Sequence, residues 1–171
     1  MEGRKLAQAM EATAAAIASV RDGVHFAVIT GNHHATVVYP AARPLAVASA
    51  ATRAEAREAL RSVRAGGGTA IGRWIALASG VLAGHTGVRH AILLTDGKDE
   101  HETPSELDQA LAGASGVFQC DCRGVGTDWI VSELRRVADA LLGSVDIVAD
   151  PDGLAADFTA VMEAAMGRKV A

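Results

Sequence analysis

Apolar residues recur along the chain with two different spacings, which predict alternating helices and strands. Stripes at steps of three and four positions are typical of amphipathic helices, and they run through 3–21, 52–63, 71–82, 104–111, 130–141 and 154–165. Short apolar runs are typical of buried strands, and they occupy 24–29, 35–39, 91–95, 117–122 and 145–148. This order predicts an α/β fold with helices on both faces of a sheet.

The first two strands are joined by a turn at 30–32, which is short enough for a hairpin. The strands 24–29 and 35–39 should therefore be antiparallel. The following helix is expected to begin with Thr52 as its cap, because Glu55 three residues later completes the pattern of a capping box.

Length and composition indicate one domain that covers residues 1–171. Half of the residues are hydrophobic, and the net charge of −4 comes with dispersed basic residues, which argues against a nucleic-acid partner. No apolar run approaches the length of a membrane span, and no signal-peptide core follows Met1. We therefore expect a cytoplasmic protein, provided that Met1 is the true start.

The two cysteines, Cys120 and Cys122, alternate along one predicted strand. Their side chains share a face, but an extended strand holds them too far apart for easy disulfide closure. A second Cys/His pair with zinc-site spacing is missing from the sequence. We expect buried, reduced thiols with a structural role.

The strand 91–95 ends in an acidic segment. This segment contains Asp96-Gly97, Asp99, Glu100 and Glu102. Open α/β sheets bind their ligands at the carboxyl ends of strands, and carboxylate oxygens suit a hard divalent cation. The alternative is an ordinary Asp-Gly turn.

A run of glycines at 66–68 precedes Thr69 and the helix 71–82. It is not a P-loop, because no Lys-Ser/Thr pair follows and a helix rather than a strand precedes it. We interpret the glycines as a tight bend that lets the backbone approach another segment closely. Thr69 offers a hydroxyl at the helix start, where its alternative role is that of the N-cap.

Signatures of an enzyme are missing from the sequence. The segment 124–129 is a near miss to a dinucleotide fingerprint, because Trp129 stands where the third glycine is needed. The chain contains no Gly-x-Ser-x-Gly elbow, and no pair of histidines has the i, i+4 spacing. His33 and His34 fall in the hairpin turn, where we expect them to be solvated.

Taken together, GGGTAIG, HAILLTDGKDE and CRGVGTDWIVSELRRVAD resemble segments of the von Willebrand factor A (VWA) domain family. The resemblance implies a Rossmann-like, mostly parallel sheet with one antiparallel edge strand. It also implies a metal-ion-dependent adhesion site (MIDAS), at which three loops hold Mg²⁺, Mn²⁺ or Ca²⁺. Thr69 matches the family's second loop and Asp96 its third.

The family's first loop, Asp-x-Ser-x-Ser, has no match, and Met1 aligns with the residue just after it. The preceding strand, central in the family, is missing too and should lie between 24–29 and 91–95. We expect an N-terminally incomplete sequence; a domain completed by another chain is the alternative. Metal binding should then be weak or absent, and self-association through the open sheet edges is expected.

The resemblance implies a non-catalytic protein-binding module. Its intact site would use a divalent ion, and a carboxylate of the partner protein would complete the coordination. Two alternatives stay open from the residues: a nucleotide-binding or hydrolytic α/β enzyme, and a metal-free structural VWA-like domain.

Overall fold

The computed structural model describes residues 3–64, 66–97, 99–125, 131–148 and 153–167, in which helices and strands alternate. In chain order they are α1 (Gly3–Ser19), β1 (His25–Phe26), β2 (Val28–Gly31), β3 (Ala35–Tyr39), β4 (Ala46–Val47), α2 (Ala50–Leu60), α3 (Ile71–Leu82), β5 (His90–Thr95), α4 (Pro104–Ala114), β6 (Gln119–Val125), α5 (Val131–Ala140), β7 (Val145–Val148) and α6 (Leu154–Gly167).

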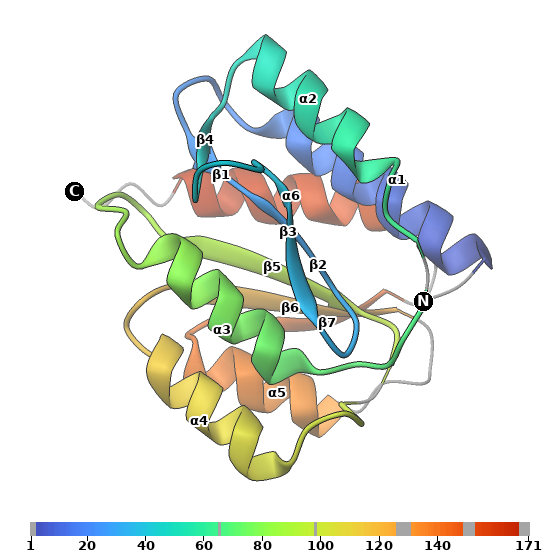
Figure 1. The fold of residues 1–171 in the computed structure, drawn as a ribbon, viewed down its shortest axis with the longest axis vertical. Helices are drawn as coiled ribbons and strands as arrows, with labels where there is room; N and C mark the ends of the chain where they lie inside the picture. The colour runs from blue at the N-terminus through green and yellow to red at the C-terminus, as the bar shows by residue number, and fades with distance from the viewer. Residues whose placement is uncertain (1–2, 65, 98, 126–130, 149–152, 168–171) are drawn as a thin grey trace.

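Strands β5, β6 and β7 form a parallel sheet in that order. The register aligns His90 with Gln119 at one end and Thr95 with Gly124 at the other, so the carboxyl ends meet at one edge. Helices α3, α4 and α5 cover one face of this sheet, and α1 and α6 cover the other (Figure 1). The predicted α/β architecture is confirmed.

The main core lies between this sheet and the helices α3, α4 and α5. Cys120 and Cys122 belong to it, with 1% and 0% of their surface exposed, beside Leu93 of the neighbouring strand. The nearby Cys122 thiol and then burial raise the pKa of the Cys120 thiol well above its ordinary value. Both thiols are therefore packed as small apolar groups, and their burial was expected from the sequence.

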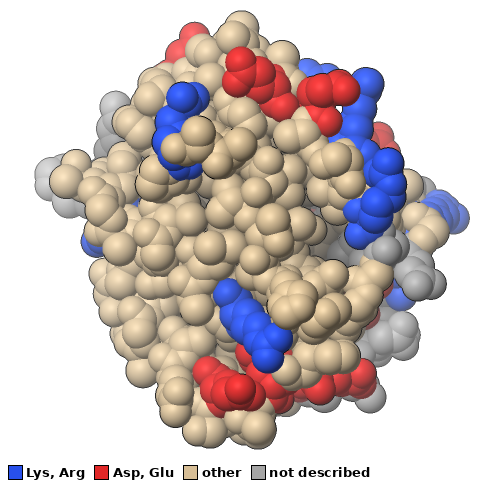
Figure 2. Space-filling model, viewed as in Figure 1, with Lys and Arg blue, Asp and Glu red and all other residues tan. Residues whose placement is uncertain are grey.

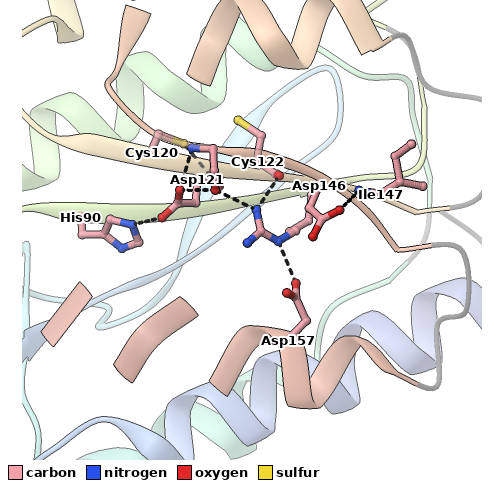
Figure 3. Close-up of polar contacts among 9 residues, drawn as sticks. His90, Cys120, Asp121, Cys122, Asp146, Ile147 and Asp157 are labelled. Atoms are coloured by element: carbon pink, nitrogen blue, oxygen red, sulfur yellow. Dashed lines mark hydrogen bonds and ion pairs between the residues drawn. The ribbon is translucent and has the colours of Figure 1, made fainter. Parts of the chain in front are cut away.

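A buried polar network lies on the opposite face of the sheet, toward α6 (Figure 3). Asp121 lies 2.6 Å from His90 Nε2 and accepts hydrogen bonds from the Ser144 amide and hydroxyl. Burial acts to raise the pKa of Asp121, but the bonds from Ser144 and His90 outweigh it and hold that pKa below its ordinary value. Arg123 Nε donates to Asp157 Oδ2 over 2.7 Å, which attaches α6 to β6.

The hairpin β2–β3 is a separate antiparallel pair, as predicted, and β1 pairs with β4 in the same sense. Within the described part of the chain, no backbone ladder joins either pair to β5. One edge of β2 and one edge of β5 therefore have no strand neighbour there. A missing central strand would leave these two edges.

The predicted strand 24–29 is divided in the structure into β1 and β2. The division arises because the two halves bond to different partners, β4 and β3, and the register of the hairpin shifts between Val28 and Ile29. The short strand β4 was not predicted, since Pro40 and Pro44 suggested an irregular segment.

The N-cap of α2 is Ser49, so the prediction of a Thr52 cap is wrong. The Ser49 hydroxyl accepts from the Thr52 amide at 3.1 Å, and Thr52 Oγ1 accepts from the Ser49 amide at 2.8 Å. Ser49 and Thr52 thus form a capping box in which threonine takes the place of glutamate. Glu55 instead accepts a 2.6 Å hydrogen bond from the Tyr39 hydroxyl.

Gly143 is required by the packing of the α5–β7 turn against β6. A Cβ added there would lie 1.7 Å from the Cys120 carbonyl oxygen, which belongs to the backbone and cannot move aside. We expect Gly143→Ala to destabilise the fold by about 1–3 kcal/mol, the usual range for overpacking, measured as a lower melting temperature. Gly113→Ala is the matched control, because a Cβ at that exposed helical position meets nothing within 4 Å. Equal melting temperatures for the two variants would contradict this account.

Candidate functional site

Thr69 and Asp96 line one small hollow at the carboxyl end of β5. The hollow has a volume of about 70 Å³. Its walls come from the hairpin turn, the glycine loop, α3 and the end of β5: Gly31, Asn32, Gly66, Gly67, Gly68, Thr69, Trp74, Leu94, Thr95 and Asp96. Two side chains separated in the sequence are thus brought to one place, each with an oxygen that suits a hard cation.

Thr69 is fixed by the loop that follows β5. Its carbonyl oxygen accepts hydrogen bonds from the Glu100 and His101 amides at 3.2 and 3.1 Å. Its hydroxyl oxygen would lie 3.1 Å from a Cβ at Gly97, next to Asp96. The N-cap of α3 is Ala70, whose side chain makes no capping hydrogen bond. The alternative role of Thr69 as that cap is therefore wrong.

Asp96 lies in a bend that follows β5 directly. The Gly97 amide donates to Thr95 Oγ1 at 3.2 Å, so a local turn does form, as the alternative interpretation of Asp-Gly expected. This turn keeps Asp96 half-buried at the rim of the hollow. A turn and a ligand position are therefore compatible here.

The other acidic residues of this segment are used differently. Asp99 Oδ1 accepts from the Ile71 amide at 3.1 Å, and Glu102 accepts from the Gly72 amide. These amides belong to the first turn of α3, where negative charge is favoured. Asp99 and Glu102 are not among the residues that line the hollow. Of the acidic residues named for this segment, Asp96 alone lines the hollow, and its role as a metal ligand stays a prediction.

Asp99 lies close to the carboxyl groups of Glu102 and Glu133. Burial, a hydrogen bond with Glu102 and the nearby charges of Glu102 and Glu133 raise its pKa from 3.8 to about 8, although the Ile71 amide acts to lower it. The Asp99 amide in turn donates to Glu133 Oε2 at 3.1 Å. Asp99 therefore carries a proton at neutral pH.

This raised pKa makes the stability of the protein fall as pH rises. The folded state binds the proton more tightly than the unfolded state, so the stabilisation is complete below about pH 4 and is lost as pH approaches 8. We expect Asp99→Asn to flatten the decline of melting temperature between pH 5 and pH 8. Because Asp99 is partly exposed, solvent screening reduces this contribution to on the order of 1 kcal/mol.

The control for this pH series is Glu100→Gln, which removes an exposed carboxylate from the same loop. This variant should keep the slope of the unsubstituted protein. A slope in Asp99→Asn equal to that of the unsubstituted protein would show that Asp99 does not hold the proton.

The glycine loop lies close to other segments of the chain, as the sequence indicated. The structure shows which side chains it contacts. Gly66 and Gly67 have φ values of +152° and +75°, which disfavour side chains. A Cβ at Gly67 would meet His33, and one at Gly68 would meet His101. The expectation that His33 is simply solvated is therefore incomplete, because its ring packs against this loop.

The sequence did not predict that the hairpin turn between β2 and β3 contributes to this site. Trp74 Nε1 donates to the Asn32 carbonyl at 2.7 Å. The indole also lies over Gly31, where a Cβ would be 2.2 Å from its nitrogen. The sequence contains both residues, a glycine in the turn and a tryptophan in α3. Their contact becomes visible only in the folded structure.

Thr69 and Asp96 provide the kind of ligand atom that a hard cation prefers, but they provide too few of them. Thr69 offers a neutral hydroxyl and Asp96 a carboxylate, whereas Ca²⁺ and Mg²⁺ take about six or more oxygens. In the ranges that the structure describes, no three His, Cys, Asp or Glu side chains form a group that could hold a metal ion. The chain by itself thus provides part of a metal site. The segment 126–130, which includes Thr127 and Trp129, lies outside the described residues.

The face shown in Figure 2 is mostly uncharged over its centre, and Lys and Arg side chains gather along its upper right edge. Among the described residues, no helix combines the length and the hydropathy needed to cross a membrane.

Comparison with known proteins gives matches among solved structures. No protein-family model matches the chain, and no curated protein does. A von Willebrand factor type A protein from Catenulispora acidiphila is 48% identical, with a TM-score of 0.96 over 98% of this chain and 40% of that chain. BatB from Bacteroides thetaiotaomicron is 19% identical, with a TM-score of 0.74 over 95% of this chain and 88% of that chain.

A third match is proximal thread matrix protein 1 from the mussel byssus, in a structure with a zinc-occupied MIDAS motif. It is 17% identical, with a TM-score of 0.67 over 92% of this chain and 42% of that chain. Fold, loop arrangement and the Catenulispora acidiphila match together show that the chain belongs to the von Willebrand factor A family. The chain spans 40% of the length of that relative.

Proposed function

We propose that this chain is a non-catalytic protein-binding module whose divalent cation is held in part by Thr69 and Asp96. One observation carries the proposal: two oxygen-bearing side chains from separate loops line one hollow at the carboxyl edge of β5. Mg²⁺ is the expected ion, with Mn²⁺ or Ca²⁺ as substitutes. The mussel protein with an occupied MIDAS motif supports metal binding in this class of site.

When bound, the cation supplies a positive charge with open coordination positions. Asp96 would neutralise part of that charge, and the Thr69 hydroxyl would orient the ion without adding charge. Further oxygens would have to come from groups other than Thr69 and Asp96, and a carboxylate of the partner protein would take an open position. Affinity in the chain by itself should be weak, since its two donors are few.

The enzyme alternative is less well supported. A phosphate would have to approach the start of α3, but Asp99 and Glu102 already accept hydrogen bonds from its Ile71 and Gly72 amides. These two amides are therefore already bonded and not available to a phosphate, which normally uses such amides. The glycine loop also follows a helix, unlike a P-loop. Catalysis is therefore not part of the proposal.

The cytoplasmic location and the exclusion of nucleic acid and membrane stay predictions. Self-association is a further one, because the unpaired edges of β2 and β5 in the described residues offer backbone groups to a second strand.

Thermal unfolding in the presence of candidate ligands tests the proposal. Millimolar MgCl₂ should raise the melting temperature slightly, EDTA should reverse the increase, and ATP or GTP without magnesium should have no effect. A larger response to nucleotide would favour the enzyme alternative. No response to either ligand, in the chain and in an upstream-extended form, would favour the metal-free structural domain.

A further inference from the structure

Three imidazoles cluster beside the glycine loop, and the proposed oxygen site does not use them. His33 lies in the turn between β2 and β3, and His101 lies in the loop after β5. Their ring centroids are 5.9 Å apart, with an interplanar angle of 34°. The His34 ring centroid lies 4.3 Å from that of His33. Two segments distant in the sequence thus bring metal-binding side chains together.

The backbones that carry these rings are anchored to the same part of the fold. The His101 amide donates to the Thr69 carbonyl at 3.1 Å. On the hairpin side, the Arg73 guanidinium donates to the His33 carbonyl, and Trp74 Nε1 donates to the Asn32 carbonyl. Because both segments are bonded to the start of α3, the fold sets the separation of the backbones that carry the two rings.

The glycine loop leaves room for the rings. A Cβ at Gly67 would lie 2.5 Å from His33 Nδ1, and a Cβ at Gly68 would lie 1.7 Å from His101 Cε1. A side chain at either position would push an imidazole away. Glycine at both positions is therefore needed for this arrangement.

Imidazole nitrogens select a different class of ion from the oxygens of Thr69 and Asp96. They suit zinc, nickel and copper, whereas carboxylate and hydroxyl oxygens suit magnesium and calcium. Two imidazoles that bind one ion at about 2.0–2.1 Å have ring centres roughly 5–6.5 Å apart. The observed separation of 5.9 Å for His33 and His101 falls in this range.

We propose that a transition-metal cation of the zinc class bridges His33 and His101, with water completing its coordination. The bridge has two protein ligands, since the described residues contain no group of three His, Cys, Asp or Glu side chains that could hold a metal ion. The bridge would join the hairpin turn to the loop after β5, which both contribute walls or supports to the hollow. A zinc-class ion there fixes the entrance to the neighbouring oxygen site.

Calorimetric titration of the chain with ZnCl₂ tests the bridge. One zinc ion per chain should bind with micromolar affinity, and His33→Ala and His101→Ala should each weaken it by at least about tenfold. Millimolar MgCl₂ present throughout the titration should leave this zinc binding unchanged, which separates the imidazole site from the oxygen site. His85→Ala is the matched control, because His85 pairs with His25 elsewhere at a centroid distance of 4.8 Å.

Hydrogen exchange provides a second measurement, since a bridge should slow exchange in both 31–35 and 99–103 when zinc is added. Circular dichroism without metal checks that the variants keep their fold. Loss of affinity in only one of the two variants, protection of only one segment, loss in His85→Ala, or only millimolar adventitious binding would each overturn the proposal.

Discussion

Extending the chain upstream of Met1 with a strand that carries Asp-x-Ser-x-Ser is expected to raise its melting temperature strongly and to suppress self-association. In the described residues β5 bonds only to β6, and β2 bonds only to β3. An inserted strand of about 5–6 residues would form a ladder on each side. Each backbone hydrogen bond contributes about 0.5–1.5 kcal/mol net. Their sum is comparable to the entire stability of a domain, roughly 5–15 kcal/mol.

The control is an extension of equal length with prolines at alternate strand positions, because proline removes the amide donors that a ladder needs. This control should leave melting and light scattering as they are in the 171-residue chain. The 171-residue chain by itself should aggregate, self-associate or unfold at low temperature. If it is instead monomeric, melts cooperatively above about 60 °C and gains stability from magnesium, the missing-strand account is wrong.

In the extended protein, Asp96→Ala is expected to abolish stabilisation by magnesium and magnesium-dependent binding of a partner. Asp96 is the carboxylate that lines the hollow, so its removal takes away the charge that balances the cation. Thr69→Val keeps the shape of the side chain but removes the hydroxyl. It should weaken the affinity for magnesium by at least about tenfold. Calorimetric titration with MgCl₂ measures both effects.

Glu100→Gln serves as the control for these two variants, since it removes an exposed charge from the same loop. It should bind magnesium as the unsubstituted protein does. Unchanged magnesium affinity in Asp96→Ala would remove Asp96 from the site, and with it the basis of the proposed function.

The pattern of apolar positions was sufficient to predict the main architecture. Short apolar runs and stripes at steps of three and four residues distinguish strands from helices, so the parallel sheet, the hairpin and the burial of Cys120 and Cys122 followed from the sequence. The meeting of Thr69 and Asp96 was implied by the resemblance to the VWA family, whose second and third metal-binding loops they match. Their role as metal ligands stays a prediction.

Features that depend on competition between similar groups could not be predicted. Ser49 and Thr52 both suit a helix cap, and only the path of the backbone decides in favour of Ser49. Acidic side chains after β5 were equally plausible as ligands, yet Asp99 and Glu102 bond to α3 amides.

Contacts between distant segments were the other limit of the sequence. Nothing near His33 in the sequence indicates that its ring lies beside that of His101. The pairing of β1 with β4 was likewise hidden, since each strand has only two residues and leaves almost no periodicity.

Crystallography of the extended protein soaked with Mn²⁺, with anomalous scattering used to locate the ion, tests the central claim most directly. The account expects one ion in the hollow at the end of β5. The Asp96 carboxylate and the Thr69 hydroxyl should contact the ion directly or through one water. Each oxygen bonded directly to the ion should lie about 2.0–2.6 Å from it. An ion bound elsewhere without Asp96, or a complete domain that binds no ion at millimolar manganese, would contradict it.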